Sequence, residues 1–102
     1  MNLDKEKPFL MSIEDVFGIK SRGTVVTGRI QQGNARKGDA VEVGYPGRPI
    51  LNATIAGVEQ VDSTPLGDNI RILLRKVEVE QVQPGMLLAA PGVLASLSEN
   101  AE

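Results

Sequence analysis

Side-chain alternation with a period of two recurs along the chain and constrains its fold more than any other feature. Apolar side chains occupy every second position in several short runs, at Phe9–Ile13, Val41–Tyr45, Leu51–Ile55 and Ile70–Leu74. Residues at every second position of a β-strand point to the same face of the sheet. Each run therefore predicts a strand with one buried face.

Turn signals separate these runs at short intervals. Tyr45-Pro46-Gly47 predicts a type II turn, because proline fixes φ and glycine supplies the positive φ. Further turns are predicted at Ser21–Gly23, Gly33–Asp39 and Ser63–Gly67. Only Val77–Gln83 has the pattern of a helical turn, and Met86–Ala90 is predicted as a last strand. Many short strands joined by turns predict an all-β fold, a small antiparallel barrel or sandwich.

Closure of the sheet is favoured on energetic grounds. A closed barrel leaves no exposed strand edges, which would otherwise pair with other chains. We therefore expect a small closed antiparallel β-barrel of about six strands. The barrel is expected to span residues 8–94, after a charged lead-in at 1–7 and before a frayed polar tail at 95–102.

Composition limits the class of function. The chain has 102 residues, 41% of them hydrophobic and 24% charged, which suits one compact domain. It has no cysteine and no histidine, so thiolate metal sites and the commonest general base near neutral pH are absent. A formal net charge of -2 gives no reason to expect broad electrostatic attachment to nucleic acid. We expect neither a cofactor nor a metal.

The sequence also lacks the signals of membrane attachment and of nucleotide hydrolysis. No apolar run approaches the length of a membrane span, and the charged first residues lack the apolar core of a signal peptide. We expect a cytoplasmic protein without membrane contact. The phosphate-binding pattern Gly-x-x-x-x-Gly-Lys-Ser/Thr is absent, so we expect no nucleotide bound by this chain and no GTPase activity.

Two consecutive acids, Glu14 and Asp15, interrupt the alternation that begins at Phe9, and Val16 and Phe17 follow them. A β-bulge or bend accounts for the interruption, and bulges re-aim side chains. The plain interpretation is a solvated acidic corner at a strand kink. A paired-carboxylate enzyme is the alternative, but the sequence offers no nucleophile or metal partner for it.

A second group of candidates lies on the outward face of the strand that carries Ile70–Leu74. Asn69, Arg71, Leu73 and Arg75 alternate with its apolar residues. A leucine beside arginines can support a nucleobase while guanidinium groups meet phosphate. The plain alternatives are an ordinary exposed leucine and an asparagine that bonds its own backbone in a turn.

Several short motifs, in their order along the chain, resemble the second, β-barrel domain of elongation factor Tu and related translational GTPases. These motifs are Ile13–Phe17, Gly23–Arg29, Gly57–Glu59 and Gly67–Asn69. The resemblance extends from Lys7 to Gly92. It implies a translation-associated binding module that carries out no chemistry. In that family the domain follows a GTPase domain, for which 102 residues leave no room.

The resemblance implies a site for the aminoacylated 3′ end of transfer RNA. It assigns Glu14, Asp15 and Phe17 to the pocket for the aminoacyl group, where two acids would hold the α-ammonium region. Thr27 matches a family residue near that pocket. From its residue type alone, Thr27 indicates no more than β-propensity.

The same resemblance assigns further residues to the terminal nucleotide. Glu59 matches a glutamate that contacts the ribose, and a carboxylate can accept a hydrogen bond from a 2′-hydroxyl. Asn69 matches a residue at the aminoacyl ester, and Leu73 one near the terminal adenosine. Ile19 and Val25 match apolar residues that border the adenosine.

The chain departs from the family pattern in three places. The segment between Glu59 and Asn69 is shorter and carries Asp62, where the family has a cation soon after the glutamate. Arg71 replaces a usual glycine, and it either fills the groove or restores the lost charge. Lys20-Ser21 replaces a glycine in a hairpin that approaches ribosomal RNA in the family. The expected partners are aminoacyl-tRNA or the ribosome, or else a separate protein partner of a barrel that has lost RNA binding.

Overall fold

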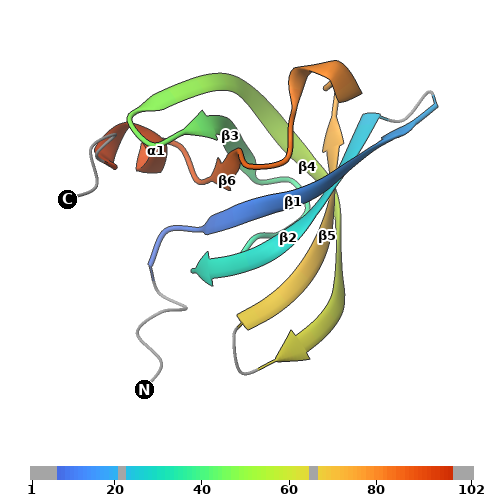
Figure 1. Ribbon diagram of the computed structural model, residues 1–102, viewed down its shortest axis with the longest axis horizontal. Coiled ribbons are helices and arrows are strands. Elements are labelled where there is room, and N and C mark those ends of the chain that lie inside the picture. The colour runs from blue at the N-terminus through green and yellow to red at the C-terminus, as the bar shows by residue number, and fades with distance from the viewer. Residues whose placement is uncertain (1–6, 21–22, 65–66, 98–102) are drawn as a thin grey trace.

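The computed structural model describes residues 7–20, 23–64 and 67–97, and of these it describes only the backbone at 62–64 and 67–68. Its strands are β1 (Leu10–Ile19), β2 (Gly23–Gln32), β3 (Ala40–Tyr45), β4 (Arg48–Thr64), β5 (Gly67–Arg75) and β6 (Leu87–Ala89). They form a closed barrel in the order β1-β2-β5-β4-β3-β6, and every pair is antiparallel (Figure 1). The small closed antiparallel barrel predicted from the sequence is confirmed.

Aliphatic side chains from alternating positions fill the interior of the barrel. The largest fully buried apolar residues of this core are Met11, Val26, Val43, Ile55, Ile72, Leu74 and Leu88. Each alternating run predicted from the sequence contributes to this core or packs against it. Complete burial of one such side chain contributes about 1.5–3 kcal/mol. The barrel is therefore held together by aliphatic burial, with little help from aromatic residues.

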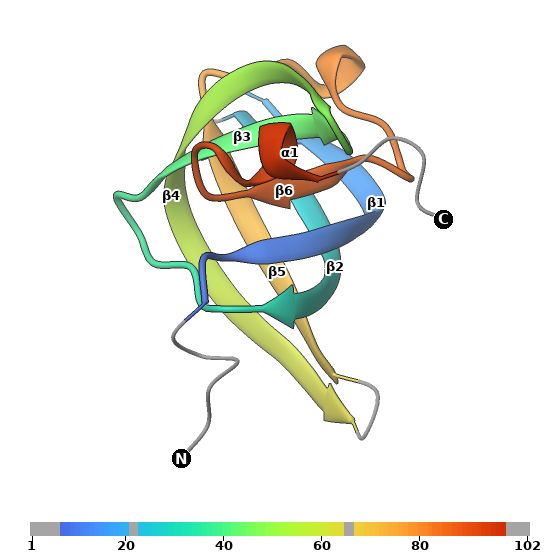
Figure 2. The same cartoon turned by 90° about the vertical axis from the view of Figure 1, so that its left-hand side faces the viewer.

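In the residues that the structure describes, two short helical segments accompany the barrel. The 3-10 helix η2 (Val79–Gln81) lies within the helical turn predicted at 77–83. The helix α1 (Val93–Ser96) was not predicted, and it lies against β3, β4 and β6 (Figure 2). Its residue Leu94 is buried in a second apolar cluster with Leu10. In the described part of the chain, no helix has the length and apolar character needed to cross a membrane.

The turns follow the glycine signals where the structure describes them. Pro46 and Gly47 form the turn between β3 and β4, and Gly47 has a φ of 73°. The predicted turn at Ser21-Arg22 and the loop centre at Pro65-Leu66 lie outside the described residues, as do most of the predicted lead-in and tail. The loop expected to begin at Ser63 was placed too early, because β4 continues to Thr64.

Strands β4 and β5 extend past the barrel as a two-stranded arm (Figures 1 and 2). β4 has 17 residues, and β3 pairs with it only from Arg48 to Thr54. Its pairing with β5 continues to Thr64. In the arm, β4 therefore pairs with β5 along one edge. Its other edge extends past Thr54, the last residue that pairs with β3.

Candidate nucleic-acid interface

The candidate residues lie on the outer face of β1, β2, β5 and β4, where cross-strand pairing arranges several of them in a row. Asp15 of β1 pairs with Thr27 of β2, and Thr27 pairs on its other side with Arg71 of β5. Arg71 in turn pairs with Glu59 of β4. Directly paired residues point to the same face of a sheet. These candidates therefore form one row across neighbouring strands.

A second row lies beside the first. Phe17 pairs with Val25, and Val25 pairs with Leu73. Leu73 pairs with Gly57 of β4. The Phe17 side chain is 53% exposed, whereas Val25 is buried although it points away from the barrel interior. This row supplies an apolar strip beside the polar row.

A shallow hollow of about 240 Å³ opens between the two rows. It is lined by Val25, Gly57, Val58, Glu59, Arg71 and Leu73. No heavy atom lies within 4 Å of a Cβ built on Gly57, so the missing side chain of this glycine helps to create the space. Small-molecule sites commonly occupy about 300–1,000 Å³. The hollow therefore has room for one ring or side chain, with the remainder of a ligand lying on the surface.

An ion pair forms the polar side of the hollow. Arg71 Nη1 lies 2.7 Å from Glu59 Oε1, and the two side chains are 47% and 65% exposed. Exposed pairs of this kind contribute about 0–1 kcal/mol, because water screens them. The Arg71 side chain is therefore not fixed rigidly in the hollow. It is held at the rim by a contact that a ligand can replace.

The predicted irregularity at the two acids is confirmed as a β-bulge. The β1–β2 register shifts between Ile13 and Asp15, which leaves Glu14 as the extra residue. Val16 packs inward against the core after the bulge, while Glu14 and Asp15 are both exposed. The bulge therefore restores the alternation so that Asp15 and Phe17 share the outer face.

A third row contains Asn69 and a residue that the sequence analysis missed. Asn69 pairs with Arg29 of β2, and Arg29 pairs with Ser12 of β1. Arg29 Nε and Asn69 Oδ1 are both buried and have no hydrogen-bond partner. The interpretation of Asn69 as a turn residue that bonds its own backbone is wrong, because it lies inside β5. The sequence analysis included Arg29 only as the last residue of the Gly23–Arg29 motif and assigned it no role.

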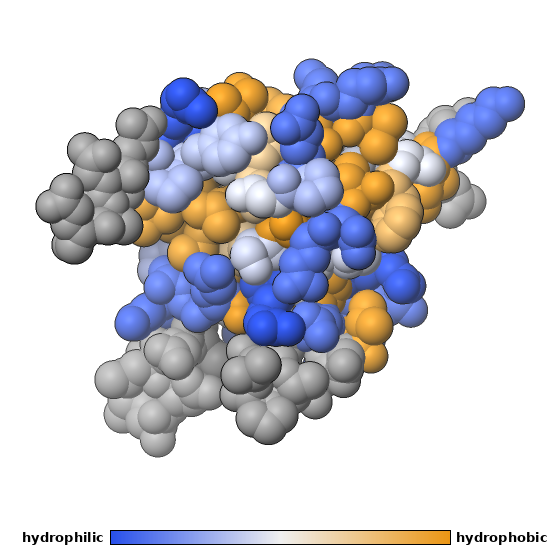
Figure 3. Space-filling view, viewed as in Figure 1, coloured by the Kyte–Doolittle hydropathy of each residue, from blue (hydrophilic) through white to orange (hydrophobic). Residues whose placement is uncertain are grey.

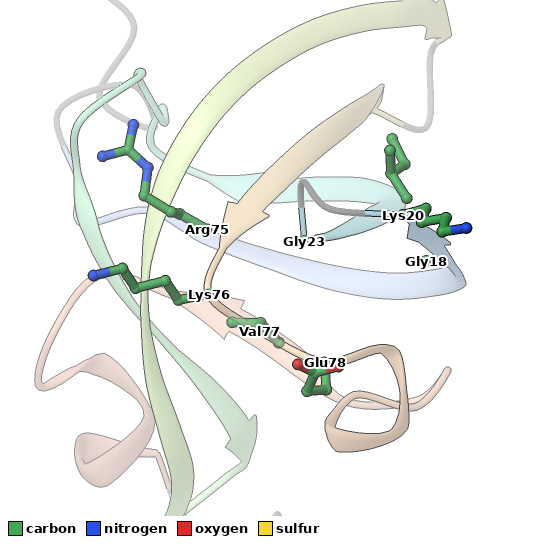
Figure 4. A pocket seen from close by; sticks show the side chains of 8 residues that line it. Gly18, Lys20, Gly23, Arg75, Lys76, Val77 and Glu78 are labelled. Atoms are coloured by element: carbon green, nitrogen blue, oxygen red, sulfur yellow. The ribbon is translucent and has the colours of Figure 1, made fainter.

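One expected neighbour lies elsewhere. Ile19 contributes to a different hollow, of about 460 Å³, and does not line the one that contains Val25. This second hollow also contains Lys20, Arg75 and Lys76, but Figure 4 shows that the ammonium group of Lys20 points away from the other two cations. The three positive groups do not converge on a common point. The larger hollow therefore lacks the geometry of an anion site.

The described side chains of the three rows offer the chemistry of recognition. They provide hydrogen-bond donors and acceptors, opposite charges and an apolar floor, and Figure 3 shows hydrophobic and hydrophilic residues interspersed on the face that it displays. No group of three or more His, Cys, Asp or Glu residues in the described ranges is placed to hold a metal ion. No model of a known protein family matches the chain.

Proposed function

We propose that this chain is a non-enzymatic binding module whose outer face recognises the aminoacylated 3′ end of transfer RNA. The arrangement of the candidates supports this proposal. Residues that the resemblance assigns to one ligand, among them Asp15, Thr27 and Glu59, stand in one row across the outer face. The hollow beside Glu59 is lined by Val25 and Leu73, two of the three residues matched to the terminal adenosine.

Each part of the face has a distinct role in this proposal. The base of the terminal nucleotide lies in the hollow against Val25 and Leu73, and its ribose hydroxyl donates a hydrogen bond to Glu59. The amide group of Asn69 donates to the ester carbonyl. The carboxylate of Asp15 attracts the α-ammonium group, and the exposed ring of Phe17 borders the amino-acid side chain.

Competition between charged and uncharged transfer RNA tests the proposal. We expect the wild-type chain to bind the charged form more tightly, and Asn69→Ala to reduce that preference because the ester loses a donor. Gly57→Leu fills the hollow and should weaken binding of both forms. Asn52→Leu, a matched change at an exposed position of β4 outside the hollow, should leave binding unchanged. Equal binding of the two RNAs by the wild-type chain contradicts the proposal.

The alternative function is that of a protein-interaction barrel that has lost RNA binding. Two observations favour it: the Glu59–Arg71 ion pair already satisfies the carboxylate, and apolar side chains such as Phe17 and Val61 are 53% exposed. In this case a purified partner should bind the chain equally well before and after nuclease treatment. Phe17→Ser or Val61→Lys should weaken that complex, whereas Gly57→Leu in the hollow should weaken only an RNA complex.

A further inference from the structure

We propose that Arg29 and Arg71 act together as a phosphate-binding pair on the outer face of β2 and β5. The ligand class is a nucleotide whose phosphate group lies between the two guanidinium groups. This inference rests on the proposed function, because it specifies which part of a terminal nucleotide the face recognises. It departs from the expectation that this chain binds no nucleotide, which followed from the missing glycine-rich phosphate cradle.

The strand register places the two arginines on one face and within reach of one anion. Arg29 lies directly opposite Asn69, and Arg71 follows Asn69 by two residues on β5. Diagonal neighbours of this kind across an antiparallel pair lie about 7–8 Å apart. An arginine side chain is long enough to span half of this separation. Two guanidinium groups can therefore meet the same phosphate.

Both arginines have N–H donors that make no contact with another described residue. Arg71 contacts Glu59 through Nη1, and a guanidinium group carries five N–H donors in a planar fork. Among the described residues, the side chain of Arg29 has neither an ion pair nor a hydrogen-bond partner, and its Nε is buried without an acceptor. Arg29 can therefore turn toward an anion without breaking a side-chain contact to another described residue, and its solvent-facing N–H groups exchange water for the anion. Arginine also matches phosphate geometry with paired N–H groups.

The order of the rows matches the order of groups in a nucleotide. Successive residues on one face of a strand lie about 7 Å apart. Moving along β5, Leu73 marks the apolar hollow, Arg71 marks the row that contains Glu59, and Asn69 marks the row that contains Arg29. The apolar floor suits a base and the carboxylate of Glu59 suits a ribose. The two guanidinium groups, one in each of the last two rows, suit a phosphate that lies between those rows.

The acids on this face set the expected strength of binding. Glu59 is already paired with Arg71, while Glu14 and Asp15 are exposed on β1 with β2 between them and Arg71. In the backbone register, Asp62 of β4 pairs with Asn69 in the row that contains Arg29. The negative charge of these acids opposes a second anion, and salt screens this opposition as well as the attraction. Phosphate recognition should therefore depend on the short-range contacts of Arg29 and Arg71.

A titration of the full chain with three small probes tests the inference. The probes are adenosine, adenosine 5′-monophosphate and adenosine 3′-monophosphate, followed by amide chemical shifts of ¹⁵N-labelled protein. We expect a monophosphate to bind roughly tenfold or more tightly than adenosine, since a hydrogen bond to a charged group is worth about that ratio. The two monophosphates distinguish which side of the ribose faces the arginines.

Matched variants show which arginines are responsible for the tighter binding of the monophosphate. Arg29→Gln and Arg71→Gln should each reduce the advantage of the monophosphate, and the double variant should abolish it. Arg75→Gln, at an exposed position of the same strand outside the small hollow, should keep it. The amide spectra of the variants verify that each is folded. A monophosphate advantage that survives the double variant overturns the inference.

Two other outcomes separate this inference from the function on which it rests. Equal affinity for adenosine and both monophosphates, with shifts confined to the hollow, overturns the phosphate pair and leaves the proposed function standing. Failure to bind any probe overturns the phosphate pair, and failure to bind charged transfer RNA as well overturns both.

Discussion

The inner and outer faces of β2 and β5 are built from alternate residues of the same two strands, and their side chains differ sharply. On the inner face, Val26, Ile72 and Leu74 are completely buried and all aliphatic. On the outer face, Thr27 and Leu73 are half-buried and Arg71 is exposed. Closure of the barrel demands buried, mostly apolar side chains on one side only, and the buried hydroxyl group of Thr24 on that side donates a hydrogen bond to Val77 O. The other side is free to carry charges, hydroxyl groups and a hollow.

Truncation of one residue on each face should give the largest difference between them. Ile72→Ala removes most of a fully buried side chain, and we expect it to lower the free energy of unfolding by about 2–5 kcal/mol. Leu73→Ala should lower it by less than about 1.5 kcal/mol, because a half-buried side chain loses less transfer free energy. Urea denaturation followed by circular dichroism measures both. Equal losses would show that the two faces are not distinct.

Two glycines allow a second comparison, in which the expected changes in the free energy of unfolding are smaller. A Cβ added at Gly28 would overlap the backbone carbonyl oxygen of Ser12, so Gly28→Ala must shift β1 away from β2. We expect a loss of about 1–3 kcal/mol, as for other overpacked sites. Gly57→Ala points into open space, and it should leave stability unchanged or raise it by up to about 1 kcal/mol.

The same denaturation experiment compares the two glycine variants. The amide spectrum of Gly57→Ala should also keep the wild-type pattern outside the arm. Tolerance of alanine at Gly28 would mean that the β1–β2 register differs from the one described.

The smallest effect is expected at the Glu59–Arg71 pair. Glu59→Gln should lower the free energy of unfolding by less than about 1 kcal/mol, since both side chains are largely in water. The difference from wild type should shrink further in high salt. Denaturation at two salt concentrations measures it. A loss as large as that of Ile72→Ala would assign this pair to the structure of the barrel and not to its exposed face.

Local patterns were sufficient to predict much of this molecule. The alternation at Ile70–Leu74 predicted both the strand and its buried face, because side-chain direction follows from backbone geometry alone. The acids Glu14 and Asp15 predicted a bulge because they broke that alternation. Pro46-Gly47 predicted a turn because glycine tolerates the positive φ found there.

The missed features depend on contacts between distant segments. Helix α1 is too short to show a helical period, and it is held by the burial of Leu94 and by the hydrogen bond from Gly47 N to Leu94 O, at 2.7 Å. Arg29 carries no local signal of a site. Its interest comes from its position opposite Asn69, which only the pairing of β2 with β5 creates.

The sequence by itself determined the alternating strand segments at Phe9–Ile13, Val41–Tyr45, Leu51–Ile55 and Ile70–Leu74, the buried face of each and the turn at Pro46-Gly47, because backbone sterics and side-chain periodicity act over a few residues. The tertiary structure alone decided that β5 lies between β2 and β4 and in which register. Side-chain alternation with a period of two is common to all the strands, so it does not specify which strands pair with each other. The rows that bring Asp15, Thr27, Arg71 and Glu59 together therefore exist only once the barrel has closed.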